Sequence, residues 1–158
     1  MQKGLDLRRG YASFSWETKV QALQMIGVVV VSHGKLAREL VRAAEHVVGS
    51  QDAFRAISIE AEDDIDERRE QIRETVRACE TGSGVIILTD MFGGTPSNLA
   101  FANLASGKVD VIGGVNLPML IHLAQIRSEL SLAEAVQAAC EAGQRYIRIG
   151  SEAMARSK

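Results

Sequence analysis

Short apolar runs alternate with longer amphipathic stretches along the chain from about residue 26. The runs at residues 26–31 (IGVVVV) and 84–90 (GVIILTD) are rich in β-branched side chains and bounded by glycine, which is typical of parallel strands covered on both faces. Residues 54–59 (FRAISI) alternate as a further strand, and residues 108–114 (KVDVIGG) predict a fourth. A short fifth strand is predicted at residues 145–150 (RYIRIG).

The stretches that separate the predicted strands at residues 26–31, 54–59 and 84–90 have the periodicity of amphipathic helices. Residues 35–48 place their apolar side chains on one stripe, and Gly49 follows as a stop signal. Residues 62–80 carry acids in the first turns and arginines later, which suits the helix dipole. We interpret this charge run as a solvated helix face.

The second half of the chain predicts three more helices, at residues 96–105, 117–126 and 131–143. In the first of these, Thr95 is the expected N-cap and Pro96 takes the first helical position. In the third, Ser131 and Glu134 form a capping box, and Gly143 is expected to end the helix.

Strands separated by helices indicate right-handed βαβ units and the α/β class. We expect three layers, with a mainly parallel four-stranded sheet and helices on both faces. Because two helices in succession precede the last strand, residues 145–150 are expected to lie antiparallel at an edge, within the subunit or exchanged in a homodimer. Residues 25–158 form one domain in this interpretation, and residues 1–24 are a disordered extension or an upstream start before Met25.

The amino-acid composition and net charge indicate which kinds of partner and compartment to expect. Aromatic residues make up only 4% of the 158 residues and the formal charge is −2, so a base-stacking or basic nucleic-acid binder is not indicated. Cys79 and Cys140 lack metal-ligand spacing and are expected to be free thiols in a reducing compartment. No apolar run approaches the ~20 residues that span a bilayer, and the first 24 residues have no secretory core, so we expect a cytoplasmic protein.

Candidate chemistry lies where the predicted strands end. In a doubly wound sheet the ligand site lies beyond the carboxyl ends of the strands, where the strand order reverses. The first strand ends at Ser32, His33 and Gly34, and the third at Thr89 and Asp90. If these strands are neighbours, the carboxylate of Asp90 can hold one ring nitrogen of His33 as N–H and leave the other free to attack.

A glycine loop follows the third strand and predicts an anion site. Gly93 and Gly94 can turn backbone N–H groups inward, and the N-terminus of the next helix adds its unpaired donors. We expect the segment 93–98 to hold a phosphoryl group. Its candidate contacts, together with the end of the first strand, are Ser32, Gly93, Gly94, Thr95, Ser97 and Asn98.

The combination of features, rather than any single residue, favours function. A lone histidine after a strand is more often structural, and a glycine turn before a helix is common. Met91, Phe92 and Met119 are interpreted as hydrophobic packing near the site, and His46 and His122 as surface or core residues. P-loop, dinucleotide and serine-hydrolase motifs are absent from the sequence, and no metal or cofactor is implied.

With these residues assembled, the chain resembles the IIA component of the mannose/fructose/sorbose family of the bacterial phosphoenolpyruvate-dependent sugar phosphotransferase system (PTS). The resemblance runs from about residue 25 to the end and rests on VVVVSHGKLARELVRAAEHVVG, GVIILTDMFGGTPSNLA and VIGGVNLPML. It implies that His33 is phosphorylated by the phosphohistidine of HPr, that Asp90 orients its ring, and that Thr95 lies beside the phosphoryl group. It also implies a homodimer that exchanges an antiparallel strand.

Three functions follow as hypotheses. The first is a phosphotransferase that accepts a phosphoryl group from HPr and passes it to a separate IIB component in sugar uptake, because no IIB segment is present in this sequence. The second is a regulatory module of an incomplete PTS, whose phosphorylation state controls a partner protein. The third is a flavodoxin-like domain that binds a free anion without phosphotransfer.

Overall fold

The computed structural model describes residues 24–155, of which residues 153–155 are described by their backbone alone. The extension predicted at residues 1–24 therefore lies, apart from Gln24, outside the described residues. The elements are β1 (Gly27–His33), α2 (Leu36–Val48), β2 (Phe54–Ile59), α3 (Ile65–Cys79), β3 (Val85–Thr89), α4 (Thr95–Phe101), β4 (Val109–Gly113), α5 (Leu117–Ile126), α6 (Leu132–Arg145) and α7 (Gly150–Ala155).

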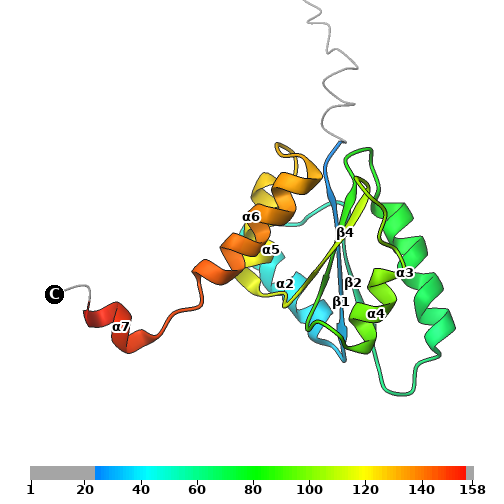
Figure 1. Cartoon of the computed structure of the whole chain (residues 1–158), viewed down its shortest axis with the longest axis horizontal. Helices are drawn as coiled ribbons and strands as arrows, with labels where there is room; N and C mark the ends of the chain where they lie inside the picture. The colour runs from blue at the N-terminus through cyan, green and yellow to red at the C-terminus, as the bar shows by residue number, and fades with distance from the viewer. Residues whose placement is uncertain (1–23, 156–158) are drawn as a thin grey trace, which may run out of the picture.

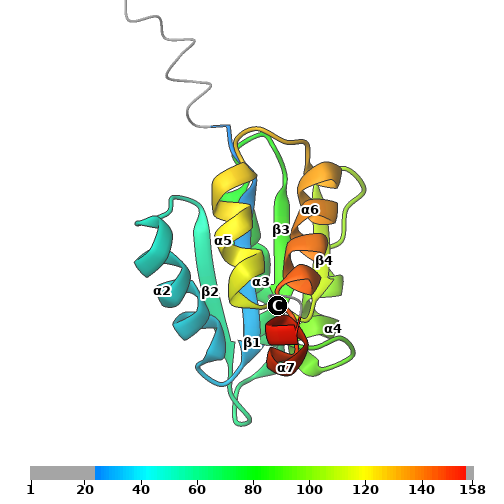
Figure 2. The same cartoon turned by 90° about the vertical axis from the view of Figure 1, so that its left-hand side faces the viewer.

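The four strands form one parallel sheet in the order β2-β1-β3-β4, which confirms the predicted α/β class. Helices α2, α5 and α6 cover one face and α3 and α4 cover the other, so the domain has three layers (Figure 1; Figure 2). The chain passes from β1 to β2 on one side and then returns to β3 on the other. The strand order thus reverses between β1 and β3, which is where a ligand site is expected.

Alternating side chains of the two central strands divide the core in two. On one face, Val28, Val30, Ile86 and Leu88 pack under α2, α5 and α6. On the other face, alternate residues such as Val29 and Val31 pack under α3 and α4. The four valines of β1 are fully buried, and burial of each such side chain stabilises the fold by about 1.5–3 kcal/mol before entropy is counted. This packing makes β1 a rigid support for the residues at its end.

The predicted boundaries of α4 and α6 are wrong, and α4 ends at Phe101 rather than at residue 105. The N-cap of α4 is Gly94, with no side-chain cap, and Thr95 lies inside the helix. Helix α6 continues past Gly143 to Arg145. Gly143 serves close packing instead, because an alanine Cβ there would come within 2.8 Å of Cε of Met119. The capping box of Ser131 and Glu134 is confirmed.

The predicted fifth strand is not formed within this chain. Residues 147–149 have no regular structure and pair with no strand of the described sheet. Helix α7 stands away from the three layers (Figure 1), and Ile147 and Ile149 are 76% and 61% exposed. A strand needs a neighbouring strand for its backbone hydrogen bonds, and among residues 24–155 no strand lies beside this segment. Cys79 and Cys140 are free, as expected.

Candidate functional site

The candidate site lies at the carboxyl ends of β1 and β3, which are paired neighbours in the sheet. His33 is the last residue of β1, and Asp90 directly follows β3. The register of the two strands, with Val31 opposite Thr89, brings these residues together although they are 57 positions apart. The predicted adjacency of His33 and Asp90 is therefore present in the structure.

One carboxylate oxygen of Asp90 binds His33 twice. Oδ2 accepts a hydrogen bond from the backbone N–H of His33 at 2.9 Å and lies 2.8 Å from Nδ1 of the ring. The other oxygen, Oδ1, accepts from the N–H of Met91 at 2.9 Å. An ionised carboxylate is only an acceptor, so the proton of the neutral ring lies on Nδ1 and the lone pair on Nε2.

The hydrogen bonds at Asp90 keep this carboxyl ionised. Burial alone would raise its pKa, but the N–H and ring of His33 and the N–H of Met91 outweigh that effect, and the pKa lies below its ordinary value of 3.8. The side chain of Asp90 is only 13% exposed, whereas that of His33 is 50% exposed. The site therefore presents an accessible imidazole on a fixed, charged support.

Gly94 lies directly against the imidazole of His33. An alanine Cβ at this position would be 2.9 Å from Cε1 and 3.5 Å from Nε2 of the ring. The start of α4 is thus placed beside the nitrogen that carries the lone pair. The first N–H groups of a helix have no acceptor within the helix, which makes this end of α4 a candidate source of donors, although Pro96 in its first turn carries no N–H.

The glycine loop uses part of its hydrogen-bonding capacity internally, which limits the predicted anion site. The N–H of Gly93 donates to Oγ of Ser97 at 3.1 Å, and Ser97 is buried. These two groups hold the loop against α4 and are not directed at a phosphoryl group. Thr95 and Asn98 are exposed on α4 and remain candidates for that contact.

Ser32 does not fit its predicted role as a phosphoryl contact. It is fully buried, and its hydroxyl accepts the N–H of Ala37 at 2.6 Å and donates to the carbonyl of His33 at 3.2 Å. Helix α2 has no side-chain cap from its own N-cap residue, Lys35. Ser32 supplies that cap from the end of β1 and so ties the backbone of His33 to the helix.

Met91 and Phe92 differ from the predicted packing residues. They are 55% and 71% exposed, although the ring of Phe92 contacts that of Phe101 edge-on at 5.1 Å between centroids. Apolar surface is therefore accessible beside His33. The support that Met91 gives Asp90 through its backbone was also missed, although an aspartate at a strand end commonly binds a nearby N–H in this way.

The other predicted residues lie away from the site. His46 is exposed near the end of α2, and His122 is half-buried on α5. Met119 is buried in the core. Among residues 24–155, no group of three or more metal-binding side chains is found, and no helix is long and apolar enough to cross a membrane.

A family model and the similar proteins of known sequence point to the same protein family. The family described as PTS system fructose IIA component matches residues 27–140. The PTS system fructose-specific EIIA component of Bacillus subtilis is 26% identical over 135 residues, which cover 85% of this chain and 92% of that protein. The PTS system mannose-specific EIIAB component of Escherichia coli is 30% identical over 125 residues, 78% of this chain but only 39% of that protein.

Solved structures agree with the fold. The PTS IIA protein associated with the fucose utilization operon of Streptococcus pneumoniae is 30% identical, with a TM-score of 0.69 over 82% of this chain and 96% of that one. The PTS component EIIA of Streptococcus agalactiae has a TM-score of 0.73 at 24% identity, over 81% and 99% of the two chains. The second of these similarities supports the fold alone.

Proposed function

The chain belongs to the family of PTS IIA components of the fructose and mannose type, and from that premise we propose that it carries a phosphoryl group on Nε2 of His33. Family membership supports a phosphotransfer role in a sugar PTS. The proposal adds which atom of this chain is the nucleophile, which protein donates the phosphoryl group and which protein accepts it.

The observation that carries the proposal is the contact between Nδ1 of His33 and Oδ2 of Asp90 at 2.8 Å. It fixes the tautomer and directs the lone pair of Nε2 away from the carboxylate, on a ring that is half exposed. A nucleophile of this kind needs a positioned, deprotonated nitrogen more than it needs a separate base.

In the proposed step, Nε2 of His33 attacks the phosphorus of a phosphohistidine on the donor protein. The new P–N bond forms as the donor's P–N bond breaks, and the donor's nitrogen keeps the electron pair. The proton on Nδ1 of His33 stays in place, so the phosphorylated ring acquires formal positive charge. The Asp90 carboxylate stabilises that charge, and a hydrogen bond between charged groups contributes about 1.5–3 kcal/mol.

The surroundings of Nε2 suit a phosphoryl group. The backbone of Gly94 approaches this nitrogen, and α4 begins at the next residue, so the positive end of its helix dipole lies close by. Thr95 is the exposed hydroxyl nearest to Gly94 in the chain. Phosphoryl transfer depends mainly on such positioning and charge stabilisation.

HPr is the proposed donor and a IIB component the proposed acceptor. Both partners would have to reach the same exposed imidazole, so their binding is mutually exclusive. The exposed Met91 and Phe92 give these partners an apolar contact beside His33. The family favours this carrier role over a regulatory module or a free-anion binding domain.

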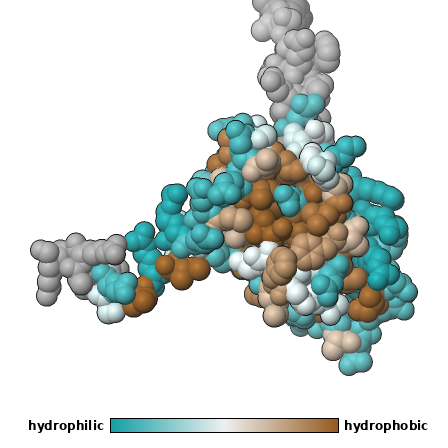
Figure 3. All heavy atoms as spheres, viewed as in Figure 1, coloured by the Kyte–Doolittle hydropathy of each residue, from teal (hydrophilic) through white to brown (hydrophobic). Residues whose placement is uncertain are grey.

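We further propose a homodimer in which residues 147–149 pair antiparallel with β4 of a second copy. Strand β4 lies at the edge of the sheet; Ala105 already bridges its first residue, Val109, and Val111 beyond it is only half-buried. A hydrophobic area covers this region in Figure 3. The part of this edge beyond Val109 and the apolar segment 147–149 can supply each other with backbone hydrogen bonds in a second copy.

The test is phosphorylation of the full chain by phosphoenolpyruvate, enzyme I and HPr, followed by intact-mass measurement under alkaline conditions. One phosphoryl group is expected on the wild-type protein and on the His46→Ala and His122→Ala controls, but none on His33→Ala. Labelling that persists in His33→Ala would refute the proposal. Subsequent loss of the label to a purified IIB component would identify the acceptor.

A further inference from the structure

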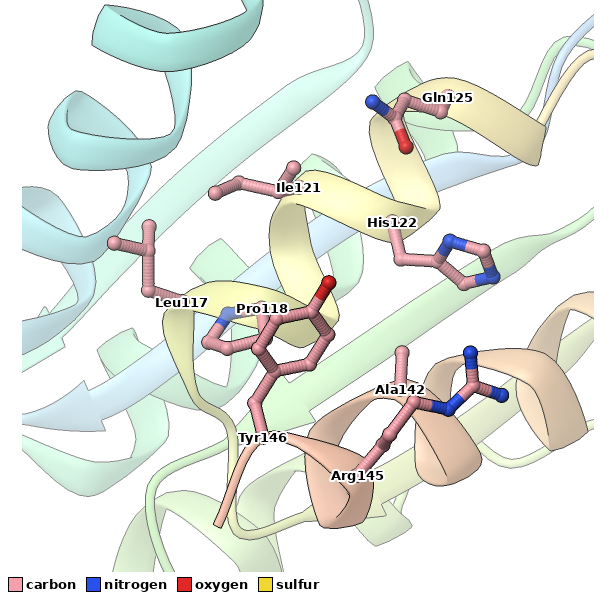
Figure 4. A pocket seen from close by; sticks show the side chains of 8 residues that line it. All are labelled: Leu117, Pro118, Ile121, His122, Gln125, Ala142, Arg145 and Tyr146. Atoms are coloured by element: carbon pink, nitrogen blue, oxygen red, sulfur yellow. The ribbon is translucent and has the colours of Figure 1, made fainter. Parts of the chain in front are cut away.

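A second concave site lies between α5 and the end of α6, away from His33. It has a cavity volume of about 200 Å³, and its lining residues are Leu117, Pro118, Ile121, His122, Gln125, Ala142, Arg145 and Tyr146 (Figure 4). The lining combines an apolar part with polar groups and contains no carboxylate. Such a combination is typical of small-molecule sites.

The apolar and cationic groups occupy different ends of this pocket. Figure 4 shows Leu117 at one end, and the guanidinium of Arg145 beside the imidazole of His122 at the other. The ring of Tyr146 lies over Pro118 with its hydroxyl directed toward α5. The pocket therefore has an apolar wall and a donor-rich end that is suited to an anion.

Arg145 has its charge available for a ligand. Arg42, Arg68, Arg69 and Arg73 form ion pairs with acidic side chains, whereas within residues 24–152 no such pair involves Arg145. A guanidinium forms bidentate hydrogen bonds with carboxylate or phosphate groups, and a ring N–H of His122 would add a further donor.

The framework of the pocket is held in place before any ligand binds. The side chain of Asn116 caps α5 through the N–H of Met119 at 3.1 Å and donates to the carbonyl of Gly143 in α6 at 3.1 Å. The absence of a side chain at Gly143 allows the two helices to approach closely. A preformed pocket loses little entropy when it binds a small molecule.

We propose that this pocket binds a small organic anion with an apolar body, such as an aromatic or branched carboxylate. The anionic group binds Arg145 and His122, and the apolar body packs against Leu117, Pro118 and Ile121. The pocket shares no lining residue with the His33 site, so the proposal does not depend on phosphotransfer.

The test is titration of the full-length protein, in the assembly it adopts, with benzoate while backbone amide shifts are followed by NMR. Shifts are expected in α5 and the last turn of α6. Benzyl alcohol, which lacks the charge, and acetate, which lacks the apolar body, should each bind at least several-fold more weakly.

Arg145→Gln should weaken benzoate binding about tenfold, because a charge-assisted hydrogen bond is lost. Arg77→Gln is the matched control, since Arg77 is also exposed and lies on α3, on the opposite face of the sheet. The proposal would be overturned if wild type and Arg145→Gln bound benzoate equally well, or if benzoate and benzyl alcohol bound equally well. It would also be overturned if the shifts were confined to other elements, or if nothing bound because a second copy covers the pocket.

Discussion

Replacing Gly94 with alanine would place a methyl group against the imidazole of His33. The backbone of Gly94 has φ −81° and ψ 173°, which alanine adopts without strain. The conflict is steric: the new Cβ would be 2.9 Å from Cε1 of the ring, whereas ordinary contacts begin at 3.4 Å. The ring must therefore move by about 0.5 Å, either away from Asp90 or across the approach to Nε2.

A shift of this size should reduce the rate of phosphorylation much more than it reduces stability. Because a misplacement of about 1 Å can cost roughly 100-fold in rate, we expect a loss of about tenfold from the shift, and more if the methyl group also blocks Nε2. His33 is half exposed and can yield, and alanine lowers the entropy of the unfolded chain. The free energy of unfolding should thus stay within about 1 kcal/mol of wild type.

The assay is the single-turnover rate of phosphoryl transfer from phosphorylated HPr, with unfolding by urea measured on the same samples. Gly150→Ala is a neutral control, since Gly150 has open space around it. Gly93→Ala separates strain from steric conflict: its φ of +84° should cost about 1 kcal/mol of stability, but its Cβ would meet nothing within 4 Å. If Gly94→Ala transferred phosphate at the wild-type rate, the assignment of Nε2 as the reacting atom would be wrong.

Four further substitutions test other parts of the structure. Asp90→Asn should slow phosphorylation at least tenfold in the same transfer assay. Because the folded pKa of Asp90 is lowered, the stability it contributes should be present above about pH 3.8 and should disappear as pH falls through the lower folded pKa. Acid unfolding of the wild-type and Asp90→Asn proteins would measure this difference. Ser32→Ala should lower the free energy of unfolding by about 1 kcal/mol in urea, through loss of the cap on α2. Gly27→Ala should destabilise by about 3 kcal/mol or more and lower the melting temperature sharply, since its Cβ would lie 2.4 Å from the backbone oxygen of Cys79. Ile149→Asp should leave the fold intact but shift the mass measured by light scattering from dimer to monomer, and a dimer that persists would contradict the proposed strand exchange.

The sheet and the position of the site were predictable because both depend on local patterns and on connectivity. The valine-rich β1 and the run before Asp90 form strands in almost any context that buries them. Right-handed crossovers then place the ends of β1 and β3 on one edge, so His33 and Asp90 meet without any knowledge of side-chain positions. The segment at residues 147–149 could not be placed in this way, because it pairs neither with the edge strand β4 nor with any other strand among the described residues.

The hydroxyl groups show why the details of a site were harder to predict than its location. Ser32 precedes His33 in the chain and Ser97 follows the glycine loop, and the sequence predicts both as contacts of a phosphoryl group. Each is fully buried, and each accepts a backbone N–H instead, from Ala37 and Gly93. A buried N–H without an acceptor is costly, so the nearest hydroxyl is used to satisfy the backbone before it is available to a ligand. If His33 carries a phosphoryl group as proposed, the contacts to it fall to the exposed groups at the start of α4, while the two serines hold the segments that carry His33 and Gly94.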